Sequence, residues 1–203
     1  MKKHLRMNWW KYIAALLLPA ILWSTAFFLR GRPDGNERLR ILLVGEGADA
    51  AALQADLEAA LQSLTAQTVG EITVTQQIPE NVEYGQWLIS RQFSFDILIV
   101  SEPWRTERMG QNYFRRMSDQ LSADFSSVPQ YVETTEYGTL SYALVLHDEQ
   151  TRTRFSDYLE AETGAWLLFF SPESVNLGGE NGKGEQKDDA AIAAARYLSE
   201  AIH

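Results

Sequence analysis

Short apolar runs recur along the chain and are separated by longer, more polar segments. Residues 41–44 (ILLV), 95–100 (FDILIV) and 165–170 (AWLLFF) are the clearest of these runs. Each is short enough for a strand and too short for a typical helix. A strand that is apolar on successive residues is typical of a sheet position covered on both faces. The pattern therefore predicts three buried strands at these places.

Three further segments carry a weaker strand pattern. Residues 71–78 alternate Ile72 and Val74 with polar side chains. Residues 131–135 and 140–146 are rich in aromatic and β-branched side chains, and Glu136-Tyr137-Gly138 lies between them. Such an arrangement predicts two strands joined by a turn.

Between the predicted strands, apolar residues recur at the three- and four-residue spacing of an amphipathic helix. Asp49 can cap a helix that begins after it, and the apolar stripe of that helix is Leu53, Leu57, Leu61 and Leu64. Similar stripes predict helices at 82–93, 109–121, 151–162 and from Asp188 or Asp189 to residue 202. The strand-helix alternation of the first half implies right-handed crossovers. We predict an α/β fold with a mostly parallel sheet flanked by helices.

One apolar segment is too long for a strand. Residues 12–29 (YIAALLLPAILWSTAFFL) are 18 residues without a charge. As a helix they would span about 27 Å, close to the roughly 30 Å of a membrane's hydrocarbon core. The basic residues that precede this run favour a cytoplasmic N-terminus. We predict a single transmembrane helix that anchors the chain in the cell membrane and places the rest outside the cytoplasm.

A cleaved signal peptide is the alternative interpretation of this segment, since Ser24-Thr25-Ala26 has small residues suited to signal peptidase. Phe27-Phe28-Leu29 continues the apolar run past that point, which favours an uncleaved anchor. The predicted organisation is therefore a basic leader at 1–11, an anchor at 12–29, a polar linker at 30–40 and an α/β domain at 41–203.

Charge is distributed unevenly along the chain. The first 29 residues carry four basic side chains and no acid, so the remainder carries 14 basic and 27 acidic side chains and a net charge of −13. Such a domain repels phosphate backbones, and we predict no nucleic-acid partner. The chain has no cysteine, which excludes disulfides, thiolate metal sites and cysteine catalysis.

The order of the predicted elements resembles a known family. The leading strand, its helix, the second strand and the segment FDILIVSE (95–102) resemble the first lobe of extracellular solute-binding proteins of ABC importers. Residues 166–178 and 188–198 are similar to closing segments of such proteins. The resemblance implies a periplasmic-binding-protein-like fold, a binding role and a membrane transport protein as partner. The family has two lobes and often a lipidated cysteine, whereas this chain has room for one lobe, or two very small ones, and no cysteine.

Candidate ligand-binding residues follow two of the predicted strands. Gly45, Glu46 and Gly47 come directly after the first strand, and Glu102, Trp104 and Arg105 come after the third. In open α/β sheets, ligands bind beyond the carboxyl ends of the strands. The glycines would let a ligand approach the backbone, and Trp104 offers a flat apolar face beside a carboxylate and a guanidinium. We predict that the two segments converge on one site.

Each segment also has a plain structural interpretation. Residues 45–50 match G-x-G-x-x-A, but Glu46 and Asp49 place negative charge where a phosphate would lie. A tight turn between strand and helix explains the glycines equally well. Trp104 can simply pack beneath its own helix. We predict no cofactor for this chain.

Catalytic and metal-binding patterns are sparse. His147 is the single histidine between the predicted anchor and the C-terminal residue, and no G-x-S-x-G motif occurs. The glycine-rich loop at 178–184 does not have calcium-ligand spacing. We therefore expect a non-enzymatic extracytoplasmic binding module for a small solute or a partner protein. The alternatives are a structural or interaction protein of the cell envelope, and a hydrolase that uses carboxylates such as Glu46 and Glu102.

Overall fold

A computed structural model describes residues 17–23, 38–64, 70–78, 84–91, 94–160, 164–171 and 190–201. The chain divides into two units, Met1–Asp34 and Gly35–His203. In the first unit, residues 17–23 are helical and their side chains are exposed. In the described part of the chain, no helix is both long and apolar enough to cross a membrane. The rest of the predicted anchor, most of the linker, the loop at 178–184 and the caps Asp188 and Asp189 lie outside the described residues.

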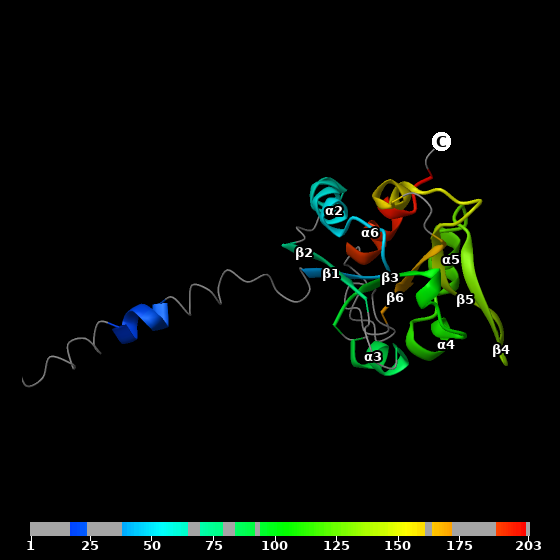
Figure 1. Cartoon of the computed structure of the whole chain (residues 1–203), viewed down its shortest axis with the longest axis horizontal. Helices are drawn as coiled ribbons and strands as arrows, with labels where there is room; N and C mark the ends of the chain where they lie inside the picture. The colour runs from blue at the N-terminus through cyan, green and yellow to red at the C-terminus, as the bar shows by residue number, and fades with distance from the viewer. Residues whose placement is uncertain are drawn as a thin grey trace, which may run out of the picture. The chain divides into compact units, whose positions relative to one another are not determined.

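The described strands of the second unit form one six-stranded sheet in the order β2-β1-β3-β6-β5-β4 (Figure 1). The strands are β1 (Arg38–Val44), β2 (Glu71–Gln77), β3 (Ile97–Ser101), β4 (Gln130–Thr135), β5 (Gly138–His147) and β6 (Trp166–Phe170). β1 pairs in parallel with β2 and β3, as the strand-helix alternation predicted. The remaining pairs, β3 with β6, β6 with β5 and β5 with β4, are antiparallel.

The sheet is therefore mixed, and the prediction of a mostly parallel sheet was wrong. The first half of the chain has helices α2 (Ala50–Leu64) and α3 (Tyr84–Arg91) between its strands, and such crossovers return the chain in the same direction. The described connections of the second half do not join parallel neighbours: the chain passes from β3 to β4 at the far edge of the sheet, and from β5 to the antiparallel β6. β4 and β5 are joined by the two-residue turn Glu136-Tyr137, which permits only an antiparallel pair.

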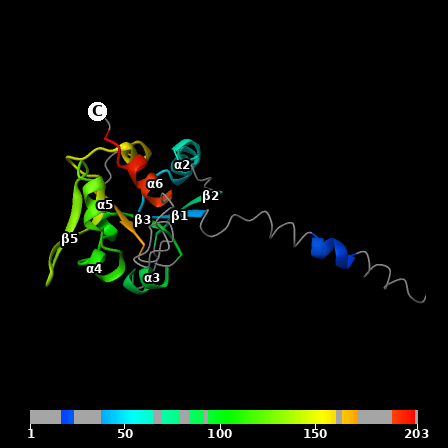
Figure 2. The same ribbon diagram turned by 180° about the vertical axis from the view of Figure 1, so that it is seen from behind.

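Helices cover both faces of the sheet (Figures 1 and 2). On one face, α2, α6 (Ala190–Leu198), α5 (Asp119–Asp124) and the 3₁₀ helix η3 (Arg154–Tyr158) pack over one apolar cluster. On the other face, α3 and α4 (Met109–Tyr113) contribute Leu88 and Met109 to a second cluster. The three predicted buried strands are confirmed, because residues 41–44 of β1 and every residue of β3 and β6 are buried.

The cap of α2 is also confirmed, and so are three of the four predicted stripe leucines; the side chain of Leu64 lies outside the described residues. Asp49 Oδ1 accepts hydrogen bonds from the backbone N–H groups of Ala51 and Ala52 at 3.1 and 3.0 Å. Leu53, Leu57 and Leu61 are fully buried. The local sequence was enough to place this helix because both its cap and its stripe lie within a few residues of its backbone.

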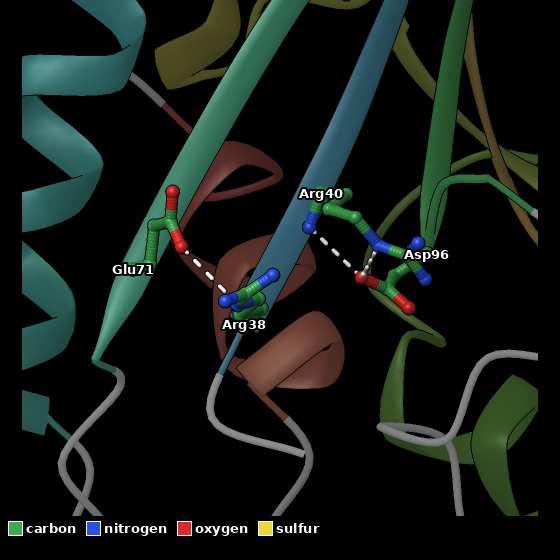
Figure 3. A network of polar contacts seen from close by, with 4 residues as sticks. All are labelled: Arg38, Arg40, Glu71 and Asp96. Carbon is green, nitrogen blue, oxygen red and sulfur yellow. Dashed lines mark hydrogen bonds and ion pairs between the residues drawn. The ribbon is translucent and has the colours of Figure 1, made fainter. Parts of the chain in front are cut away.

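β1 begins at Arg38, three residues before the predicted start. Leu39 is fully buried, and Arg38 and Arg40 on either side of it form ion pairs with neighbouring strand ends (Figure 3). Arg38 Nε lies 3.2 Å from Glu71 Oε2. Asp96 Oδ2 accepts a 2.8 Å hydrogen bond from the Arg40 backbone N–H and lies 3.5 Å from Arg40 Nε. In the sequence, residues 38–40 look like the end of a polar linker, because Arg38 and Arg40 find their carboxylate partners only in the folded sheet.

Two predicted helices are shorter than the sequence pattern indicated. The helix predicted at 109–121 is broken into α4 and α5, because the Met117 N–H donates to the Ser141 carbonyl of β5 at 2.9 Å. Ser118 then caps α5 by accepting from the Leu121 N–H at 3.1 Å. The helix predicted at 151–162 has one 3₁₀ segment, η3, in its described residues. Of the apolar side chains in this segment, Phe155 and Tyr158 are buried and Leu159 is half-buried.

Candidate functional site

An open groove of about 1270 Å³ lies at one edge of the sheet. Ser101, Trp166 and His147 are cross-strand neighbours there, so β3 and β5 end where β6 begins. β4 begins at the same edge, with Gln130 opposite Leu144. The groove is thus at the carboxyl ends of β3 and β5, the edge at which sequence reasoning placed a ligand. We call it the edge groove.

The floor of the edge groove is apolar. Tyr131 of β4, Val145 of β5 and Leu167 of β6 line it, and Val145 and Leu167 are direct cross-strand partners. The Tyr131 ring packs edge-on against Phe169 at 5.9 Å between centroids, and the Arg105 guanidinium lies 5.5 Å from the Tyr131 centroid. Burial and the nearby Glu133 carboxylate raise the pKa of Tyr131, so its hydroxyl stays protonated at neutral pH.

Carboxylates dominate the charged residues around this floor. Of the described residues that line the groove, the acids are Glu102, Asp148, Glu149, Asp157 and Glu160, and the permanent cations are Arg105 and Arg152. Glu102 Oε1 lies 3.7 Å from Arg105 Nη2, with both side chains substantially exposed. Asp148 accepts hydrogen bonds from the backbone N–H groups of Gln150 and Thr151. These bonds outweigh burial and lower the pKa of Asp148.

The other three carboxylates face solvent at the rim. Glu149, Asp157 and Glu160 are exposed, and within the described residues none of them forms a salt bridge. Glu149 is in the turn after β5, Asp157 is in η3, and Glu160 lies two residues after the end of η3. A carboxylate without a fixed partner is available to a ligand cation at little cost.

His147 and Ser156 are hydrogen-bonded in the groove wall, with 2.9 Å between Nδ1 and Oγ. Burial, followed by the Arg152 charge, lowers the pKa of His147, whereas Asp148 opposes this shift. The ring is therefore neutral at pH 7, and its proton can be on Nε2 while Nδ1 accepts from Ser156. A serine next to a neutral imidazole is one element of nucleophilic catalysis.

The surrounding contacts give this pair a structural role. Ser156 Oγ also accepts from the Thr153 N–H at 3.2 Å and completes the capping box of η3. The Asp148 carboxylate bonds to its own turn, so it does not orient His147 as the third member of a triad would. The pair therefore joins the end of β5 to η3 and shapes the groove wall.

The structure places only some of the predicted ligand-binding residues in the edge groove. Glu102 and Arg105 line the edge groove, whereas Gly45, Glu46, Gly47 and Trp104 do not belong to its lining. Trp104 is half-buried and packs edge-on against Tyr84 with 5.5 Å between centroids, as part of the apolar cluster under α3 and α4.

The backbone around Gly45 and Gly47 already has intramolecular partners. The Gln76 side chain donates to the Gly45 carbonyl at 2.8 Å, and the Glu160 N–H donates to the Gly47 carbonyl at 2.8 Å. A β-carbon at Gly45 would lie 2.2 Å from Ser101 Oγ and 2.9 Å from Trp166 Cη2. These glycines therefore let the strands and η3 approach one another, whereas Glu46 is exposed beside them.

Several groove residues were not expected from the sequence. Asp157 and Glu160 fell within a predicted amphipathic helix, where charged residues are usually a solvated face. The acidic run Asp148-Glu149 beside His147 at the end of β5 was a visible signal. This run becomes part of a groove only because η3 folds back over the same edge of the sheet.

In the described residues, no group of three or more His, Cys, Asp or Glu side chains is placed to hold a metal ion. No protein-family model matches the chain, and comparisons with curated proteins and with solved structures gave no significant match.

Proposed function

We propose that this chain is a non-enzymatic, membrane-anchored binding module of the solute-binding-protein type, and that its ligand site is the edge groove. The ligand carries positive charge and an apolar part. The observation that supports this choice is the combination of an apolar floor, formed by Tyr131, Val145 and Leu167, with a predominantly acidic rim. Small-molecule sites combine an apolar surface with a few polar groups that fix orientation in the same way.

Charge decides the class of ligand. The rim carboxylates Glu149, Asp157 and Glu160 are exposed, and the whole chain has a net charge of −9. Anions are repelled by such a surface, and cations are drawn toward it. Arg105 and Arg152 provide local positive charge, so a ligand with a secondary acceptor group such as a carbonyl or hydroxyl is also accommodated.

Binding of four small molecules to the full-length chain in detergent tests this proposal. Calorimetry is done with spermidine, tyramine, maltotriose and citrate. It should detect binding of the two amines and no binding of citrate. The double variant Asp157→Asn/Glu160→Gln should weaken amine binding by about 2- to 30-fold, since each exposed pair contributes about 0.2–1 kcal/mol. Rising salt should weaken binding as well.

Glu46→Gln is the matched control, because Glu46 is an exposed carboxylate that does not line the groove. It removes one carboxylate charge, as each of the two groove substitutions does, and should leave amine affinity unchanged. Equal loss in the control and the double variant would show that net charge alone attracts the amines. Preference for citrate or maltotriose over both amines would refute the proposed ligand class.

A further inference from the structure

The outer edge of β4 has no pairing partner among the described strands. Within the described sheet, β4 is the last strand and pairs only with β5 (Figure 1). The backbone N–H and C=O groups on the far side of an edge strand are free to pair with another chain.

The outward-facing side chains of β4 do little to prevent such pairing. Proteins usually protect an edge strand with lysine, proline, a β-bulge or an inward-pointing charge. The pairing of β4 with β5 has one irregularity, between Tyr131 and Val132, and the inward charge of β4 is bound to α4. Residues 130–135 (QYVETT) contain no lysine and no proline. Glu133 is the single charged residue in this strand, and it is buried, accepting from the Gly110 and Gln111 N–H groups at 2.8 and 2.9 Å. The exposed positions are Val132 and Thr134, both β-branched residues that strands favour.

Exposed apolar side chains also occur on this hairpin. Val132 is 51% exposed and Tyr137, in the turn between β4 and β5, is 83% exposed. A strand added along β4 would cover Val132 and reach toward the turn.

β4 leads directly into the edge groove. Gln130, Tyr131 and Val132 are the first three residues of the strand, and all three line the groove. An extended chain paired with β4 would therefore continue at one end toward the turn that follows β5, where the exposed carboxylate of Glu149 lines the same groove. At roughly 3.4 Å per residue, eight extended residues span about 27 Å, whereas six residues span about 20 Å, so the excess can enter the groove.

We propose that the edge groove and β4 together bind a basic, extended segment of a partner protein, which adds to the sheet as a strand beside β4. This inference rests on the proposed function, since it uses the same groove, and it names the ligand as a peptide segment. Charge complementarity selects this occupant. A second copy of the chain, with a net charge of −9, would be repelled by the acidic rim, whereas a lysine- or arginine-rich segment is attracted. Backbone pairing supplies affinity and alternate side chains supply specificity.

The full-length chain in detergent and the peptide acetyl-(Lys-Thr)₄-amide test this inference. Hydrogen exchange should slow at residues 130–135 when the peptide binds and should stay unchanged in β2, the strand at the other edge of the sheet. A version of the peptide N-methylated at every second residue keeps its charge and cannot donate the same backbone hydrogen bonds. It should bind at least fivefold more weakly. The acidic peptide acetyl-(Glu-Thr)₄-amide should not bind.

Variants on the two edges separate strand addition from simple charge attraction. Val132→Lys places a like charge beside the peptide and should weaken its binding by about fivefold or more. Thr73→Lys adds the same charge at an exposed position of β2 and should leave binding unchanged. Matching melting curves of the two variants establish that both are folded.

The outcomes distinguish this inference from the proposed function. If spermidine binds but the peptide does not slow hydrogen exchange in β4, strand addition is overturned and the proposed cation site is retained. Equal affinity of the N-methylated peptide has the same consequence. If β4 is already protected from exchange without peptide and the chain sediments as a dimer, the β4 edge pairs with a second copy. This outcome also overturns the binding of a partner segment. Absence of binding by spermidine and by the peptide overturns both proposals.

Discussion

At the scale of single residues, Gly45 shows how one position can be required for two independent reasons. Its φ of +144° lies in a region that L side chains rarely adopt, and a β-carbon there would lie 2.2 Å from Ser101 Oγ and 2.9 Å from Trp166 Cη2. Gly138, at the start of β5, has a φ of +110° but open space around it. The two glycines therefore separate backbone strain from crowding.

We predict that Gly45→Ala destabilises the fold much more than Gly138→Ala does. Backbone strain and overpacking each cost about 1–3 kcal/mol, so Gly45→Ala should lose about 2–6 kcal/mol and Gly138→Ala only about 1–3 kcal/mol. Urea unfolding of the two variants and the parent chain measures this difference. Equal losses would mean that Ser101 and Trp166 move aside at no cost.

At the scale of elements, the contact between β4 and α4 depends on a buried carboxylate. The first N–H groups of a helix have no partner inside the helix. Glu133 satisfies two of them, at Gly110 and Gln111, from the neighbouring strand. This contact explains how so short a helix as α4 is held on the sheet, and why β4 carries its one charge inward.

We predict that Glu133→Gln loosens α4 and costs about 1.5–3 kcal/mol of unfolding free energy, because the amide retains one acceptor oxygen and no charge. Glu136→Gln, an exposed change in the adjacent turn, is the control and should have no measurable effect. Hydrogen exchange should accelerate at residues 109–113 in the first variant. Unchanged exchange there would show that the helix is held by its apolar contacts instead.

At the scale of the whole molecule, charge and hydrophobicity are separated along the chain. The four basic residues of the first 29 precede an uncharged run, and all 27 acidic residues come after it. This asymmetry is the basis for predicting a cytoplasmic N-terminus and an acidic domain outside the cell membrane. An acidic domain held at a surface would also favour a cationic ligand, as proposed for the edge groove.

We predict that protease added to intact bacterial cells expressing the full-length chain digests a C-terminal epitope and spares an N-terminal one. The physical reason is that charged domains follow the orientation set by the basic leader. A cytoplasmic protein in the same cells reports whether the membrane stayed sealed. A C-terminal epitope that is digested only after lysis would place the domain inside.

The sequence by itself determined the features that depend on near neighbours along the chain. The buried strands β3 and β6, the Asp49 cap and the Leu53–Leu57–Leu61 stripe of α2 were all predictable, because burial patterns and caps are local. Of the residues predicted to bind a ligand, Glu102 and Arg105 line the edge groove.

Only the tertiary structure decided how these elements meet. β6 lies antiparallel between β3 and β5. The Met117 N–H bonds to β5 and interrupts a predicted helix. η3 brings Asp157 and Glu160 to the groove. Trp104 packs against Tyr84 instead of facing a ligand. Each of these outcomes depends on hydrogen bonds or packing between residues far apart in the chain, and such long-range contacts override local periodicity without leaving a pattern in it.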